Sequence, residues 1–228
     1  MKMMTDFFQG QLDYVFLVYG LAFVLMAGAC TVLQRERRQL PWLWLGLFGV
    51  THGVNEWLDM LALGLGDGPL FTLGRTIVMG LSFVFLVEFG RQGFAATGTK
   101  ALGLWVYLPI LIGVCAGGYT GLAGLNASMR YTLGLTGGLL SALVLFRSGA
   151  REENGGRCLK GAGAAMAAYA LAAGAVVPAA PFFPATIVNH SAILSAIGVP
   201  IQLIRGLLAC TVATLIWSYY VAASDSLA

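Results

Sequence analysis

Long apolar runs dominate the chain, and short polar segments separate them. A bilayer core of about 30 Å is crossed by about 20 apolar residues of helix. By this criterion the 228 residues contain seven candidate spans, at 11–33, 41–63, 70–90, 101–120, 131–147, 160–180 and 199–222. Segments rich in Gly, Pro and charge lie between them, including 34–41, 64–69, 91–100 and 148–157. We therefore predict an all-α polytopic membrane protein, a bundle of seven transmembrane helices.

Composition agrees with this pattern. The chain is 58% hydrophobic and 10% charged, with a mean hydropathy of +0.82, which is unlike a soluble domain. No soluble domain or linker interrupts the spans, so we predict one transmembrane domain over 1–228. The stretch 181–198 is short and bounded by prolines, and we expect it to lie flat at the membrane surface.

The basic residues predict the orientation. Most Lys and Arg residues fall in 34–41, 91–100 and 147–160, and short loops rich in Lys and Arg remain on the cytoplasmic side. With seven spans, the N terminus is then outside and the C terminus is cytoplasmic. The formal net charge of +3 is explained by these loops, and no nucleic-acid partner is expected.

The second predicted span carries a stripe of polar residues. His52, Glu56 and Asp59 follow the i, i+4, i+7 spacing that places side chains on one face of a helix, and Asn55 lies beside them. At 1.5 Å per residue the stripe extends from the middle of the membrane toward its outer side. A charge at such depth is costly unless it is paired or functional, so this stripe marks the candidate site.

Charges from other spans are expected at the same depth. Arg75 lies near the outer end of the third span and Arg205 near the outer end of the seventh. These two arginines would offset Glu56 and Asp59, as an ion-paired cluster in a low dielectric requires. His190, in the outer segment, could close over the same layer.

Three interpretations of this layer remain open. The first is a set of salt bridges that fixes the bundle. The second is an outward-open pocket for an anionic or polar ligand, held by bidentate hydrogen bonds from the arginines. The third is a metal or haem site. As a pocket, its predicted ligand-binding residues are His52, Asn55, Glu56, Asp59, Arg75, His190 and Arg205.

Cofactor and catalytic signals are weak. His52 and His190 are the two histidines of the chain, so at most one bis-histidine haem b could form. The chain contains no HExxH motif, no Gly-rich phosphate loop and no evident Ser/His/Asp set. We therefore expect no catalytic residues, no metal and no cofactor, with a single haem b as the alternative.

Parts of the first three spans resemble a known module. The segments FFQGQLDYVFLVYGLAFVLMAGAC, LPWLWLGLFGVTHGVNEWLDMLALGLGD and FLVEFGR resemble an N-terminal membrane module of bacterial signalling proteins. There the module precedes a cytoplasmic histidine kinase, PAS or diguanylate cyclase region. The resemblance covers mainly 7–91, implies a sensory input domain of the bacterial inner membrane, and brings no known ligand.

The leading functional prediction is therefore a sensor. It binds a small polar or anionic ligand in the outer half and relays the bound state through the last helix. The expected partners are that ligand, membrane lipid and a cytoplasmic kinase or cyclase domain, as in two-component systems, and homodimerisation is left open. The alternative is a redox membrane subunit with one b-type haem or a quinone site.

Overall fold

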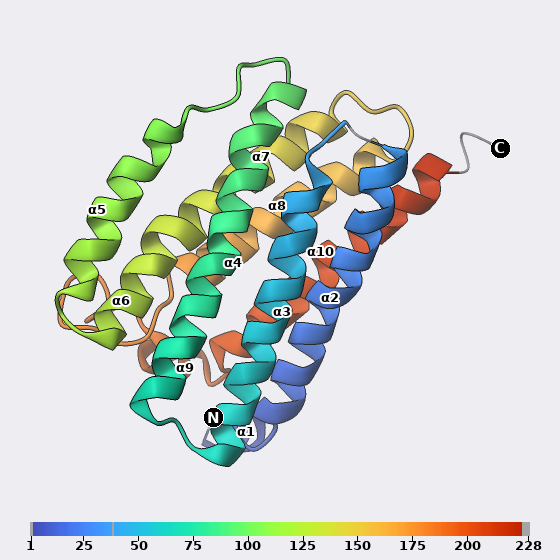
Figure 1. Ribbon diagram of the computed structural model, residues 1–228. Coiled ribbons are helices and arrows are strands. Elements are labelled where there is room, and N and C mark those ends of the chain that lie inside the picture. The colour runs from blue at the N-terminus through green and yellow to red at the C-terminus, as the bar shows by residue number, and fades with distance from the viewer. Residues whose placement is uncertain (1, 38, 225–228) are drawn as a thin grey trace.

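The described part of the chain, residues 2–37 and 39–224 of a computed structural model, consists of helices and connecting loops (Figure 1). In chain order the elements are α1 (Lys2–Gln9), α2 (Leu12–Glu36), α3 (Trp42–Leu65), α4 (Pro69–Ala96), the 3₁₀ turn η1 (Leu104–Val106), α5 (Tyr107–Gly118), α6 (Leu122–Met129), the π-helical turn η2 (Arg130–Gly134), α7 (Leu135–Gly149), α8 (Gly156–Gly174), α9 (His190–Ile197) and α10 (Ile201–Ser224).

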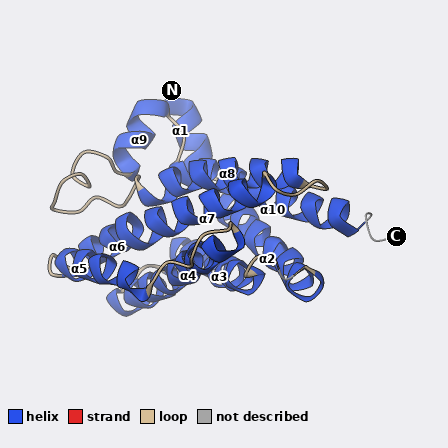
Figure 2. Cartoon of the chain, turned by 90° about the horizontal axis from the view of Figure 1, so that it is seen from above, coloured by secondary structure: helices blue, strands red, loops and turns tan. Residues whose placement is uncertain are grey.

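Six long helices form a closed ring. α2 packs against α3, α3 against α4, α4 against α7, α7 against α8, α8 against α10, and α10 against α2. α5 lies outside this ring against α6 and η2, and α9 lies beside α1 at one end of the bundle (Figures 1 and 2). α1 and the end of α10 lie at opposite ends of the bundle (Figure 1).

Among the described residues, four helical segments are long and apolar enough to cross a membrane: α2, α4, the continuous segment Leu122–Gly149, and α10. This pattern is that of an all-helical membrane protein. The other helices do not reach this combination of length and hydropathy, for reasons that their sequences show. His52, Glu56 and Asp59 lower the hydropathy of α3, Arg157 and Lys160 lower that of the 19-residue helix α8, and the apolar segment Leu104–Gly118 is short.

Several helix ends differ from the predicted spans. The predicted span 131–147 begins instead at Leu122, because the polar groups of Asn126 and Ser128 bond within the helix, to Arg130 Nε at 3.0 Å and to the Leu125 carbonyl at 3.0 Å. The predicted span 160–180 is α8, which ends at Gly174. The stretch 181–198 forms a loop and α9, whose N-cap Asn189 accepts a hydrogen bond from the amide of Ala192 at 3.0 Å.

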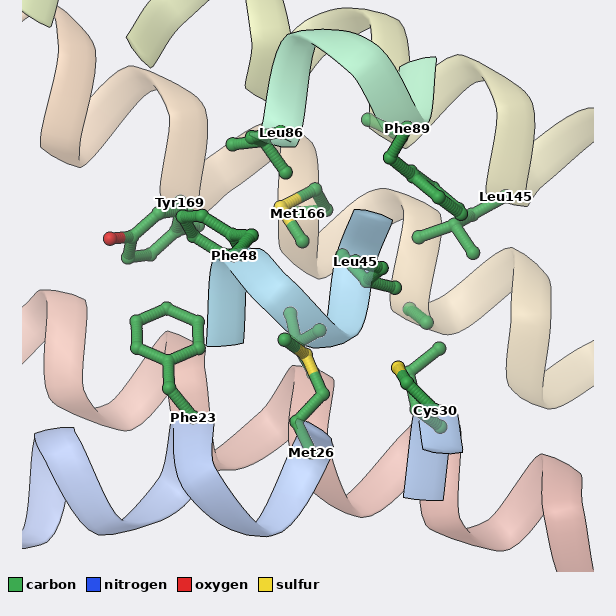
Figure 3. Packing of buried hydrophobic residues seen from close by; sticks show 14 of the residues in the cluster. Phe23, Met26, Cys30, Leu45, Phe48, Leu86, Phe89, Leu145, Met166 and Tyr169 are labelled. Atoms are coloured by element: carbon green, nitrogen blue, oxygen red, sulfur yellow. The ribbon is translucent and has the colours of Figure 1, made fainter. Parts of the chain in front are cut away.

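Large apolar side chains fill the centre of the ring. Phe23, Phe48, Leu86, Leu145 and Tyr169, from five different helices, are fully buried and meet in one cluster (Figure 3). Burying such side chains favours the packed state through dispersion and close contact, which is how helices associate in lipid. The core therefore fixes the helices around the polar groups described next.

Glycines allow the closest approach between helices. A Cβ added to Gly138 of α7 would lie 2.5 Å from the Cβ of Ala170 in α8, and one added to Gly53 of α3 would lie 2.7 Å from the carbonyl of Gly20 in α2. Real Cβ atoms do not approach so closely, so only glycine fits there. These contacts bring α2 close to α3, and α7 close to α8.

Candidate functional site

The polar stripe of α3 faces the interior of the bundle. His52, Asn55 and Glu56 are buried, and His52 Nε2 lies 3.3 Å from Glu56 Oε1 one helical turn away. Asp59, one turn further on, contacts Arg75 of α4. The helical spacing thus places all four side chains toward neighbouring helices rather than toward lipid.

A hydrogen-bond chain links four helices through His52. Its Nε2 lies 2.8 Å from the Tyr169 hydroxyl of α8, which lies 2.7 Å from the Tyr19 hydroxyl of α2. Its Nδ1 lies 2.7 Å from the Ser82 hydroxyl of α4. Ser82 donates its own proton to the Met79 carbonyl at 2.6 Å, so Nδ1 must carry the hydrogen in the His52–Ser82 bond.

The contact between His52 and Glu56 requires a shared proton. Nε2 and Oε1, 3.3 Å apart, would repel each other if both presented lone pairs. One of the two atoms therefore holds a proton. The rings of Phe23, Phe48 and Phe83 pack around the imidazole, with ring centroids 5.2, 5.1 and 5.1 Å from that of His52, respectively.

These contacts do not fit the haem alternative. Both ring nitrogens of His52 are hydrogen-bonded to neighbouring side chains, and the Phe48 ring stacks against the imidazole at 5.1 Å. His190 makes a different contact, to Arg205. The two histidines therefore do not form a pair of axial ligands.

Arg75 forms an ion-paired triad with two aspartates. Its Nη1 donates to Asp59, one of the two acids that the arginines were expected to offset, and its Nη2 donates to Asp67 of the loop before α4. Asp67 was not predicted as a site residue, because the loop sequence reads only as a turn. One guanidinium and two carboxylates give the triad a net charge of −1 when both acids are ionised.

Arg205 does not make the predicted pairing with a carboxylate. Its Nε donates to the Ala172 carbonyl at 2.9 Å, and its Nη2 donates to the Val176 carbonyl at 2.5 Å and to His190 Nε2 at 3.3 Å. These carbonyls belong to the C-terminal end of α8 and the turn after it, where the helix dipole is negative. Arg205, 3% exposed, is thus stabilised by backbone oxygens.

His190 accepts a hydrogen bond from this cation, so its Nε2 is unprotonated. Burial first, and then the charges of Arg205 and Arg130, lower the pKa of His190 to about 2. The imidazole therefore stays neutral at physiological pH and acts as a hydrogen-bond partner.

Arg130 is a site residue that the sequence interpretation missed. It lies in η2, 5% exposed, and its Nε donates to Asn126 Oδ1 at 3.0 Å while its Nη1 donates to the Ala173 carbonyl at 3.3 Å. Like Arg205 it therefore caps the end of α8. Within residues 2–37 and 39–224, neither Arg130 nor Arg205 forms an ion pair with a carboxylate.

A cavity of about 440 Å³ opens between these groups. Of the predicted residues, Asn55, Asp59, Arg75 and His190 line it, whereas His52, Glu56 and Arg205 do not. The wall also includes residues that were not predicted, notably Asp67, Thr76, Asn126, Arg130 and Gln202. The cavity therefore lies at the end of the bundle formed by the α3–α4 loop, α6 and the start of α10.

The cavity wall offers polar groups without protein partners. In the described part of the chain, the Thr76 hydroxyl, the Gln202 amide and Arg130 Nη2 make no hydrogen bond to another residue, and Asn55 makes only a long one, at 3.5 Å to Glu56. Thr76 and Asn55 are 2% and 1% exposed. Buried polar groups are normally satisfied, so this wall is suited to a polar ligand or to water.

Comparison with known proteins brings no assignment. No protein-family model matches the chain, and no curated protein or solved structure gives a significant match.

Proposed function

We propose that this protein is a membrane-embedded sensory input domain that binds a small acidic ligand in the cavity beside Arg130. The carrying observation is the buried Arg130 guanidinium, which lines the cavity and has no carboxylate partner among the described residues. The resemblance of 7–91 to signalling input modules supports the sensory role, with a kinase or cyclase as the output partner.

The argument for an acidic ligand is electrostatic. A buried cation without a counter-ion is costly, and dipolar contacts to the end of α8 offset only part of that cost. A carboxylate or phosphate in the cavity would accept charge-assisted hydrogen bonds from the free Nη2 of Arg130, each worth more than a neutral bond. Thr76 and Asn55 could complete the hydrogen bonds of such a group.

The proposed setting is a bacterial inner membrane crossed seven times. The four clearly apolar segments are joined in this proposal by α3, η1–α5 and α8, which lie alongside them in the bundle. The loops rich in Lys and Arg would lie in the cytoplasm, and the cavity would open to the outside. An output domain would then follow α10 on the cytoplasmic side.

Arg205 offers a route for the signal. It sits on α10 and holds both the end of α8 and His190, which lines the cavity. An acid that draws Arg130 toward the cavity would weaken its bond to the Ala173 carbonyl and change how α8 and α10 are joined. The bound state can shift α10 only to the extent that the ligand prefers one arrangement.

The test is thermal unfolding of the detergent-purified chain with acetate, butyrate, succinate, inorganic phosphate and γ-aminobutyrate. At least one acid should raise the melting temperature of wild type and of Arg157→Gln, a control that removes an exposed remote charge. The same acid should have little effect on Arg130→Gln. Equal shifts in Arg130→Gln and the control would contradict the proposed site. For Arg205→Ala, shifts equal to wild type with every acid would remove Arg205 from the mechanism.

A further inference from the structure

The cavity wall carries charges of both signs on different elements. The triad of Asp59, Asp67 and Arg75, from α3, α4 and the loop between them, has one more negative than positive charge when both acids are ionised. Arg130 of η2 adds a positive charge to the same wall. Among the described residues, Arg130 forms no ion pair with Asp59 or Asp67.

We propose that the cavity binds a zwitterion, a small molecule with a carboxylate and an amino or quaternary ammonium group. This inference rests on the proposed function, since it assigns the carboxylate to Arg130. The ammonium group then lies at the carboxylates of Asp67 and Asp59, which retain acceptor positions that Arg75 does not occupy. The two ends of such a ligand give the triad and Arg130 partners of opposite charge.

The alternatives fit less well. The second charge of a dicarboxylate would lie near the excess negative charge of the triad, and like charges in a site of low dielectric repel strongly. A simple monocarboxylate would leave that excess without a partner. A simple amine would leave Arg130 without a partner. A dipolar ligand gives both charges of the wall a partner.

Independent features of the wall support a ligand of this kind. Thr76 and Asn55 are almost completely buried, line the cavity and have unused hydrogen-bonding capacity within the described chain. They lie on α4 and α3 and can hydrogen-bond a ligand in the cavity. The volume of about 440 Å³ is near the lower end of small-molecule pockets, which run from about 300 to 1,000 Å³.

The experiment is calorimetric titration of the full chain in detergent at neutral pH with matched probes. Each amino acid is compared with the acid that lacks its amino group: glycine with acetate, β-alanine with propionate, γ-aminobutyrate with butyrate, and ε-aminocaproate with caproate. Succinate and butylamine complete the set as dianion and cation. We expect one amino acid to bind at least about tenfold more tightly than its matched acid, a difference of about 1.4 kcal/mol.

Two variants locate the ammonium site. Asp67→Asn keeps the Arg75–Asp59 pair and removes the excess negative charge, so it should reduce the preference for the amino acid over its matched acid. Glu153→Gln, a control that removes an exposed acid remote from the cavity, should leave that preference unchanged. Asp67 lies in a loop and is partly exposed, so the folded bundle should tolerate its replacement.

The outcomes separate this inference from the proposed function. If acids bind through Arg130 but no amino acid exceeds its matched acid, the zwitterion inference is wrong while the anion site stands. An amino-acid preference that survives in Asp67→Asn would also overturn the assigned ammonium position. If none of the acids or amino acids binds, both the inference and the proposed site fail.

Discussion

Replacing Tyr169 with Phe tests the hydrogen-bond chain at the centre of the bundle. The Tyr169 hydroxyl lies between Tyr19 and His52, at 2.7 and 2.8 Å. Tyr169→Phe removes this hydroxyl and keeps the ring, which packs 5.4 Å from that of Phe23. The variant therefore changes the polar contacts and leaves the apolar packing in place.

The expected cost follows from the two bonds lost. A buried polar group that loses its partner costs about 1–3 kcal/mol. Tyr169→Phe leaves the Tyr19 hydroxyl without its partner and leaves His52 Nε2 with only the Glu56 contact. We therefore expect the free energy of unfolding to fall by about 2–4 kcal/mol. Tyr19→Phe removes one hydrogen bond and should lower the free energy of unfolding by about 1 kcal/mol.

The double variant isolates the coupling. Once the Tyr169 hydroxyl is gone, Tyr19→Phe removes an orphaned hydroxyl, so its added cost should be near zero or favourable. The coupling free energy should then be about 1 kcal/mol or more. Equilibrium unfolding in mixed detergent micelles measures all four proteins. If Tyr19→Phe costs the same with and without Tyr169, the chain is not an energetic unit and the reasoning is refuted.

Three further predictions concern other parts of the molecule. Arg205→Gln should lower the free energy of unfolding by about 2–4 kcal/mol, because charge-assisted bonds to the end of α8 are lost; a loss below about 0.5 kcal/mol in the same unfolding assay, the range of ordinary surface changes, would contradict this role. His190 has a pKa of about 2 in the folded protein and about 6.5 in the unfolded chain. Its neutral imidazole therefore stabilises the folded protein fully above about pH 6.5, and this contribution to the free energy of unfolding is lost as the pH falls toward about 2. The slope is up to about 1.4 kcal/mol per pH unit, and unfolding measured from neutral pH down to mild acid should show a smaller slope in His190→Gln. Gly138→Ala should destabilise the α7–α8 contact, whereas Gly28→Ala, where nothing lies within 4 Å of the added Cβ, should be neutral or stabilising by up to about 1 kcal/mol; equal melting temperatures for the two variants would refute the packing argument.

The elements of the bundle follow closely from periodicity and hydropathy. The stripe of His52, Glu56 and Asp59 could be placed on one inward face because helical spacing alone determines which side chains share a face. The apolar character of α2, α4 and α10 was equally visible, since lipid-spanning length is a local property of sequence. These predictions required no knowledge of which helices are neighbours.

The side-chain contacts between helices were harder to predict from the sequence. The prediction that Arg205 offsets a carboxylate was wrong, because backbone carbonyls at the end of α8 can also stabilise a guanidinium and sequence does not show where α8 ends. Arg130 lies one residue before the predicted span 131–147, so the sequence interpretation left it outside the span and outside the candidate site. In the structure the polar groups of Asn126 and Ser128 are satisfied inside the helix, and Arg130 faces the cavity.

The central claim is that Arg130 is a buried positive charge available to a small acid. Its most direct test is equilibrium dialysis of the purified chain with the radiolabelled acid that gives the largest thermal shift. The account predicts about one bound acid per wild-type chain, with binding lost in Arg130→Gln and kept in Arg157→Gln. Undiminished binding to a folded Arg130→Gln protein would contradict it.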